Sequence, residues 1–195
     1  MHGQLENCKC FVCGQDACKQ LDYDDMTVFY ICPICGRFEI HHDLSSDKIN
    51  FDLNHLSAYL IYNGFKNKNY ERRYFTTRDK DWCDKWSQKY KQGDFTHGHP
   101  VFLSKENVEN WYPKSFAEKI DKIMLYLATC IRHIGDDIVL SSEEAFSALF
   151  VDRYDYNETE YKYIPRDLSG IKKQARYMLE YLASRNYIHQ NKSSN

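Results

Sequence analysis

The sequence predicts an α+β, mainly α protein with an N-terminal zinc ribbon built on a short β-hairpin, a helical middle region and a winged-helix-like C-terminal region. Two Cys-x-x-Cys pairs near the N-terminus predict the ribbon. Apolar residues at helical spacing predict helices over most of the remainder. Beyond residue 116 the expected order is long helix, short helix, connector, helix and strand, which is the order of a winged helix. We expect three parts, at 1–42, 43–103 and 104–195.

Length and composition are those of a globular protein. The chain has 195 residues, of which 43% are hydrophobic and 28% charged, and its formal net charge is −2. This charge excludes a globally basic coat for nucleic acid, although it is compatible with a local basic face. The apolar run at 123–131 is too short to span a membrane, and residues 1–10 lack the apolar core of a signal peptide. We therefore expect a cytoplasmic protein that does not insert into a membrane.

Cysteine spacing is the most specific feature of the sequence. Six of the eight cysteines lie in the first 35 residues, and four of them form the pairs Cys10–Cys13 and Cys32–Cys35. Each Cys-x-x-Cys turn presents two thiolates to one side of a metal, so two such turns complete a closed tetrahedron of sulfur ligands. A glycine follows each pair, at a position that requires tolerance of a positive φ. The sequence therefore predicts a structural zinc site with these four ligands.

Other roles for the cysteines are less compatible with the sequence. Disulfides are disfavoured because no secretory signal is found. A redox Cys-x-x-Cys would open a helix after a strand and would not occur twice. Cys8 is an alternative to Cys10 as the first ligand, although we favour Cys10, and the role of Cys18 stays open. We expect Cys83 and Cys130, which lie in helical patterns, to be buried.

Apolar periodicity and capping residues predict the remaining elements. Strands are expected at 27–31 and 37–40, on either side of the second cysteine pair. Ser115 and Glu118 form a capping box that opens the clearest helix, whose apolar stripe continues to Ile134. The other expected elements are helices at 53–64, 79–92, 105–111, 141–149 and 169–184, a loop or hairpin at 151–165, and a strand at 187–189.

One candidate surface for nucleic acid lies on the helix expected at 169–184. Lys172, Lys173 and Arg176 lie opposite its apolar stripe, where they could meet phosphates. Glu180 shares that face, and the segment lacks the cluster of Arg, Asn and Gln that usually reads base edges. A solvated helix face is therefore the simpler interpretation.

A second basic segment lies at 66–91, with nine Lys and Arg residues against four Asp and Glu. Aromatic side chains in such a segment can stack on the bases of single-stranded nucleic acid. However, Trp82, Trp86 and Tyr90 recur every four residues and so share one helix face. This spacing favours packing against the rest of the protein.

The histidine clusters do not complete a catalytic site. His41-His42 and Asn54-His55 resemble part of an HNH nuclease, but the third histidine expected beyond this set is absent. The His-Gly-His segment at 97–99 is a weak metal signal, and we expect a loop there. The sequence contains no GxSxG, no HExxH and no phosphate-binding glycine loop. We therefore expect no enzymatic activity, with a metal-dependent nuclease as a remote alternative.

Five features of the chain occur together in a known layout: a ribbon ending CPxCGxFxI, a leucine-serine helix like 55–60, a serine-led helix like 103–108, a Pro…Glu-Lys-x-Asp-Lys-x-x-x-Tyr-Leu helix like 113–127, and a terminal helix like 177–188. This layout resembles an N-terminal region of many uncharacterised bacterial proteins. That region usually precedes a TIR-like or nucleoside 2-deoxyribosyltransferase-like effector domain, in proteins suspected of antiphage defence or nucleotide signalling. The resemblance implies a sensing or scaffolding role. No effector domain follows Asn195, so we expect either an effector in trans or a fragment.

These observations together predict a non-catalytic, zinc-binding recognition or adaptor module. Zinc would fix the ribbon, and the helical part would bind a protein partner or a second copy of the chain. The alternative is a winged-helix regulator that binds nucleic acid through Lys172, Lys173 and Arg176.

Overall fold

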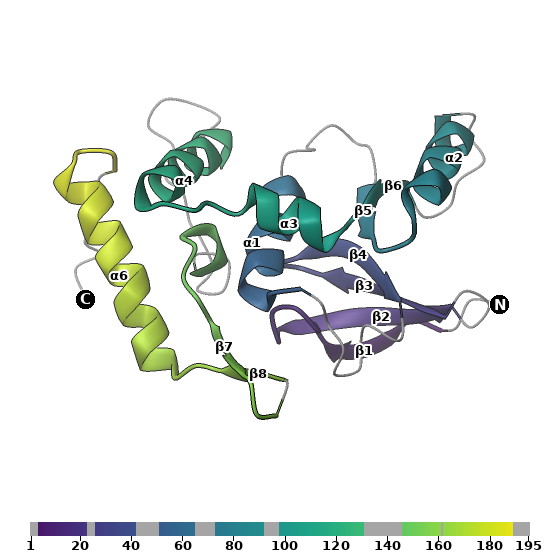
Figure 1. Ribbon diagram of the computed structural model, residues 1–195, viewed down its shortest axis with the longest axis horizontal. Coiled ribbons are helices and arrows are strands. Elements are labelled where there is room, and N and C mark those ends of the chain that lie inside the picture. Colours follow the sequence, from purple (N-terminus) through teal and green to yellow (C-terminus); the bar gives the residue numbers. More distant parts are fainter. Residues whose placement is uncertain are drawn as a thin grey trace. The chain divides into compact units, whose positions relative to one another are not determined.

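A computed structural model describes residues 4–22, 26–41, 51–64, 73–91, 98–130, 146–160 and 162–188 (Figure 1). The chain divides into two compact units, Met1–Tyr112 and Pro113–Asn195. None of the helices in the described ranges combines the length and the apolarity needed to cross a membrane.

A six-stranded sheet organises the first unit. Its strands follow one another in chain order: β1 (Glu6–Lys9), β2 (Asp16–Asp22), β3 (Thr27–Cys32), β4 (Gly36–His41), β5 (Arg73–Thr76) and β6 (His99–Phe102). The first four strands pair antiparallel, because short turns join them. The pairs β4–β5 and β5–β6 are parallel. Parallel neighbours need long crossover connections, and these contain helices α1 (Leu53–Gly64) and α2 (Lys80–Lys91).

The core of the first unit lies between the sheet and helices α1 and α3 (Lys105–Trp111). Phe38 of β4 is fully buried and stacks on Tyr30 of β3, with ring centroids 5.0 Å apart. Leu56 and Leu60 of α1 are buried against the same cluster. Tyr59 contacts Trp111 of α3 edge to face at 5.4 Å. Aromatic and leucine side chains therefore hold the two helices on the sheet.

A buried polar network joins the antiparallel strands to the parallel ones. The carboxylate of Glu39 in β4 accepts hydrogen bonds from the hydroxyls of Thr27 in β3 and Thr76 in β5, each at 2.7 Å. The guanidinium of Arg78, two residues beyond β5, also donates to Glu39. Burial of the nearby Tyr74 phenol raises its pKa, and the negative charge of Glu39 raises it further. The Glu39 carboxylate is thus hydrogen-bonded by side chains from β3, from β5 and from the residues just beyond β5.

The second unit contains helix α4 (Phe116–Cys130), a hairpin of β7 (Tyr154–Asn157) and β8 (Lys162–Pro165), and helix α6 (Leu168–Ser184). The predicted cap of α4 is confirmed, since Ser115 Oγ accepts from the Glu118 amide at 3.2 Å. The Glu118 carboxylate in turn accepts from the Lys114 amide at 2.8 Å. Asp167 caps α6 by accepting from the Gly170 amide at 3.3 Å.

Local sequence signals predict many of these elements correctly. The strands expected beside the second cysteine pair are β3 and β4, and the segment 151–165 contains the β7–β8 hairpin. The helices expected at 53–64, 79–92, 105–111 and 169–184 are α1, α2, α3 and α6, each within one residue at either end. The start of the long helix at Phe116 is confirmed as α4, whereas its expected continuation from 131 to 134 lies outside the described residues.

The predicted fold class is wrong. The first unit is built on a six-stranded mixed sheet, so the protein is not mainly α, and the ribbon hairpin is only part of that sheet. The winged-helix expectation also fails, because α6 is the last element in the described part of the chain and no strand follows it there. Residues 187–188, expected to begin a closing strand, are not in a strand. Asn186 takes a left-handed conformation just beyond the end of α6, with φ 58°.

Candidate metal centre

Strand direction explains why two cysteine pairs that are distant in sequence meet. Cys10 and Cys13 lie in the turn between β1 and β2, whereas Cys32 and Cys35 span the turn between β3 and β4. Because β1, β2 and β3 pair antiparallel in succession, β1 and β3 run in the same direction and end at the same edge of the sheet. Each strand ends where a Cys-x-x-Cys turn begins. The hairpin register therefore brings four thiols to one place.

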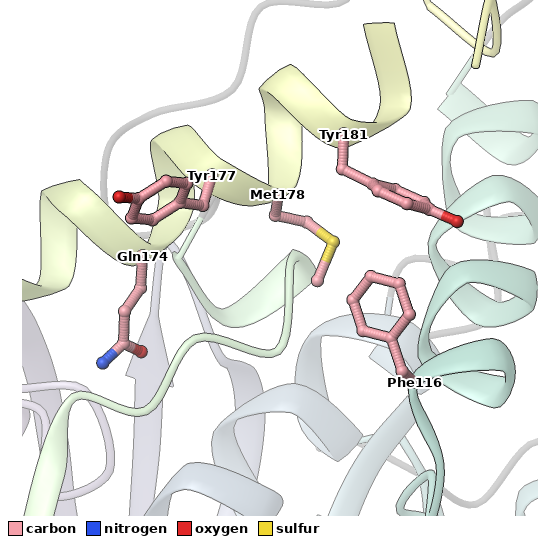
Figure 2. A pocket seen from close by; sticks show the side chains of 5 residues that line it. All are labelled: Phe116, Gln174, Tyr177, Met178 and Tyr181. Atoms are coloured by element: carbon pink, nitrogen blue, oxygen red, sulfur yellow. The ribbon is translucent and has the colours of Figure 1, made fainter. Parts of the chain in front are cut away.

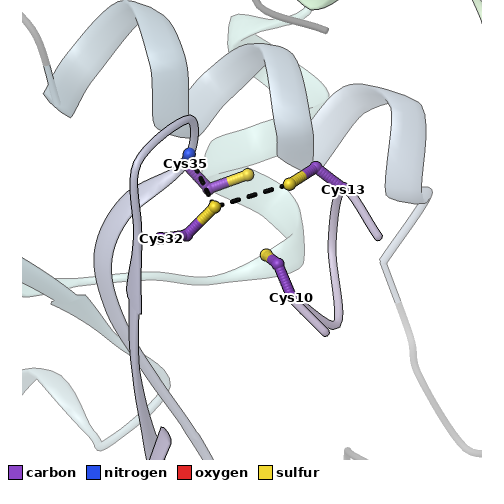
Figure 3. A group of neighbouring side chains, drawn as sticks. All are labelled: Cys10, Cys13, Cys32 and Cys35. Carbon is purple, nitrogen blue, oxygen red and sulfur yellow. Dashed lines mark hydrogen bonds between the residues drawn. The ribbon is translucent and has the colours of Figure 1, made fainter. Parts of the chain in front are cut away.

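The four sulfur atoms form a compact group. Figure 3 shows the side chains of Cys10, Cys13, Cys32 and Cys35 converging, and their Sγ atoms all lie within 4.8 Å of one another. The Sγ atoms of Cys13 and Cys32 are 3.4 Å apart. All four residues are buried, with exposed fractions between 1% and 4%. Four close cysteines of this kind could hold a metal ion.

The backbone of both turns is shaped for this arrangement. The amides of Ile34 and Cys35 donate to Cys32 Sγ at 3.4 and 3.3 Å. The first turn is closed by the Gly14 amide, which donates to the Cys10 carbonyl at 2.8 Å. Gly14 and Gly36 have φ values of 71° and 77°, so the positive φ expected after each pair is confirmed.

The close packing of the four thiols shifts their pKa values. Hydrogen bonds from the side chains of Cys10, Cys13 and Cys35 lower the pKa of Cys32 strongly. Side-chain hydrogen bonds with Cys10, Cys13 and Cys32 raise the pKa of Cys35 well above its ordinary value. A divalent cation would relieve the repulsion between four thiolates, because it supplies the charge that they lack.

The other cysteines lie outside this group. Cys8 in β1 and Cys18 in β2 are half-buried, and Cys18 Sγ lies 3.6 Å from Asn7 Oδ1. The structure therefore places Cys10, and not Cys8, beside the second pair. Cys83 is buried as expected, whereas Cys130 is only half-buried.

The basic candidates on α6 do not form a compact anion site. Lys172 and Lys173 are exposed. Arg176 is also exposed, but its Nε donates to Glu180 Oε1 at 2.7 Å, so its charge is already paired on the helix surface. These three residues occupy a solvated helix face.

The tryptophans of α2 are partly covered by cations of the same segment. Trp82 and Trp86 are half-buried, and Cys83 between them is the buried residue of this stretch. The guanidinium of Arg78 lies 4.4 Å from the Trp82 ring centroid, and Lys89 Nζ lies 4.3 Å from that of Trp86. Since these cations occupy ring faces on which a base would stack, the arrangement favours packing. The side chain of Tyr90 lies outside the described residues.

The histidines within the described ranges lie on different elements. His55 Nδ1 lies 2.8 Å from Glu109 Oε2, and the His55 ring stacks on Tyr112 at 3.6 Å between centroids. This contact joins α1 to α3, and sequence reasoning missed it because the two partners are 54 residues apart. His41 ends β4, and His99 begins β6, where a loop was expected. His42 and His97 lie outside the described residues.

Comparison of the chain with protein-family models, curated proteins and solved structures yields no match.

Proposed function

We propose that Cys10, Cys13, Cys32 and Cys35 hold a structural zinc ion and that the protein works as a non-catalytic recognition or adaptor module. The observation that supports the zinc site is the buried group of four Sγ atoms within 4.8 Å of one another. Four thiolates fill a tetrahedral coordination shell and leave no position open for water or substrate. Such a set suits a structural ion better than a catalytic one.

The metal would stabilise one end of the sheet. The two turns that carry the cysteines close the β1–β2 and β3–β4 hairpins at the same edge. A zinc ion would join both hairpins, and binding free energy would add directly to the free energy of folding. A cytoplasmic location belongs to this proposal, since a reducing compartment keeps thiols available for metal.

Recognition in place of catalysis is supported by the surface of the second unit. Phe116, Leu125 and Tyr177 are 51%, 66% and 62% exposed. Phe116 and Tyr177 line the same groove, and adjoining apolar side chains at this exposure often mark an interaction surface. A sensing or scaffolding role in a defence system rests on the sequence resemblance described above.

X-ray absorption at the zinc edge of the purified full chain tests the proposed centre. We expect four sulfur neighbours at about 2.3 Å and no nitrogen or oxygen neighbour. Coordination with a water or histidine ligand would contradict the structural assignment. Iron in the same four-sulfur site would contradict zinc while preserving the ligand set, because tetrahedral thiolates also suit iron.

A further inference from the structure

Helix α6 presents a second face in addition to its buried one. Ile171, Ala175 and Leu182 are buried and hold the helix in the second unit. The opposite surface is centred on Tyr177, whose side chain is 62% exposed. Gly170 and Ser184, seven residues before and after Tyr177, are also exposed. We call this surface, from Gly170 to Ser184, the Tyr177 face.

A shallow groove runs along one side of the Tyr177 face. It has a volume of about 400 Å³, and it is lined by Phe116, Gln174, Tyr177, Met178 and Tyr181. Figure 2 shows Phe116 of α4 beside Tyr181 of α6, and their ring centroids are 5.0 Å apart. The face therefore combines aromatic surface with the single polar amide of Gln174.

Charged residues flank the other side of the Tyr177 face. Successive helical residues are rotated by about 100°, which places Lys173 and Glu180 on one side of Tyr177 and Gln174 and Tyr181 on the other. Lys173 and Glu180 are exposed. The ion pair of Glu180 with Arg176, at 2.7 Å, holds the carboxylate at the helix surface.

The charged and polar positions beside Tyr177 are self-complementary in an antiparallel pair of two α6 helices. At about 1.5 Å per residue, Lys173 lies about 6 Å before Tyr177 and Glu180 about 4.5 Å after it. In an antiparallel pair centred on Tyr177, Lys173 of each copy therefore meets Glu180 of the other, on the same side of the pair. Gln174 meets Tyr181 on the opposite side in the same way.

The ends of the face allow two helices to approach. Gly170 of one copy would meet Ser184 of the other, since both lie about 10.5 Å from Tyr177. A Cβ atom added at Gly170 would have no heavy atom within 4 Å, so the space above it is open. Because Gly170 of one copy and Ser184 of the other are both small, the helices can approach at each end of the contact. The two Tyr177 side chains then form its centre.

We propose that the chain forms a two-fold symmetric dimer through antiparallel pairing of the Tyr177 faces of α6. This inference rests on the recognition role proposed above and names the partner as a second copy of the chain. A two-fold axis repeats every contact, so one residue pair yields two ion pairs. The proposal requires nothing of the metal centre, which lies in the first unit.

Charge reversal of the full-length protein tests the antiparallel register. Sedimentation velocity from low to high micromolar concentration should show a dimer for the wild type. Lys173→Glu and Glu180→Lys should each weaken it by about tenfold or more, because each puts like charges together twice. A 1:1 mixture of the two variants should recover a heterodimer, in which both ion pairs are again complementary. Tyr177→Glu should leave a monomer.

A matched control is available on the same helix. Lys172→Glu makes the same charge change at an exposed position that points away from the Tyr177 face, and it should leave the dimer unchanged. Circular dichroism should show native helix in every variant, and metal analysis of the same samples should show an unchanged metal content. A monomeric wild type would overturn the proposal. A dimer insensitive to Lys173→Glu, or variants that fail to recover on mixing, would overturn it as well, whatever the metal content.

Discussion

The guanidinium of Arg78 donates two hydrogen bonds to the carboxylate of Glu39, from Nε to Oε2 at 3.1 Å and from Nη2 to Oε1 at 2.9 Å. The two side chains are only 13% and 8% exposed. Glu39 lies in β4, four residues beyond the last cysteine of the metal centre, and Arg78 lies just beyond β5. The pair therefore connects the cysteine-bearing strands to the parallel half of the sheet.

Loss of Arg78 should destabilise the protein strongly. Arg78→Met leaves the buried charge of Glu39 without its cation, and we expect the free energy of unfolding to fall by about 3–5 kcal/mol. In the double variant Arg78→Met, Glu39→Gln, the buried charge of Glu39 is removed as well, and the amide can still bond Thr27 and Thr76. Asp22, whose carboxylate lies 3.8 Å from Arg78 Nη2, loses this cation in both variants, so it does not affect the comparison. Urea unfolding should show the double variant to be the more stable of the two. Equal stability would mean that the charge is not desolvated as described.

Serine substitutions should separate the cysteines of the metal centre from their neighbours. Cys32→Ser removes the sulfur that lies 3.4 Å from Cys13 Sγ and accepts two backbone amides. We expect loss of bound metal and a large fall in the melting temperature, because a structural ion contributes directly to folding. Cys18→Ser changes a half-buried thiol outside the group and should keep the metal. Metal analysis and thermal unfolding of both variants make the comparison, and metal retained by Cys32→Ser would contradict the ligand set.

The burial of Cys83 should make the protein less stable at alkaline pH. Desolvation raises the pKa of this thiol from 9.0 to about 11. The unfolded chain then releases the proton near pH 9 while the folded chain still holds it, so the free energy of unfolding falls from about pH 9 up to about pH 11. Cys83→Ala should show a shallower decline across this window, and Cys130→Ala, a change at a half-buried thiol, serves as the control. Parallel pH profiles for wild type and Cys83→Ala would refute this explanation.

The start of α4 should depend on its cap. Ser115→Ala removes the acceptor of the Glu118 amide, and we expect a loss of about 1 kcal/mol from the free energy of unfolding. Ser115→Asp keeps a capping oxygen and should retain most of the stability. Denaturant titration followed by circular dichroism measures both changes. If Ser115→Asp is no more stable than Ser115→Ala, the hydrogen bond to the amide does not account for the effect.

Local signals explain what the sequence could predict. The spacing of Cys10, Cys13, Cys32 and Cys35 specifies a compact sulfur group because each pair is fixed within one tight turn. Helices α1, α3 and α6 follow apolar periodicity, and the Ser115 cap is a pattern of four residues. Each of these features is determined by contacts between residues close in the chain.

Long-range pairing explains what could not be predicted. Strands β5 and β6 have four residues each, and they pair in parallel across helical crossovers. So short a strand carries little periodicity, and no turn fixes its register. Glu39 and Arg78 are 39 residues apart, and only the completed sheet brings them together. The mainly α prediction failed for this reason, since the basic segment 66–91 contains the short strand β5, in which Tyr74, Phe75 and Thr76 are buried.

The most direct test of the proposed zinc centre is a native mass spectrum of the full chain, purified without added metal and with its thiols unmodified. We predict one zinc ion per chain, bound by Cys10, Cys13, Cys32 and Cys35, and lost together with folded structure when a chelator is added. A folded, metal-free chain, or one whose mass shows disulfides between these cysteines, would contradict the account.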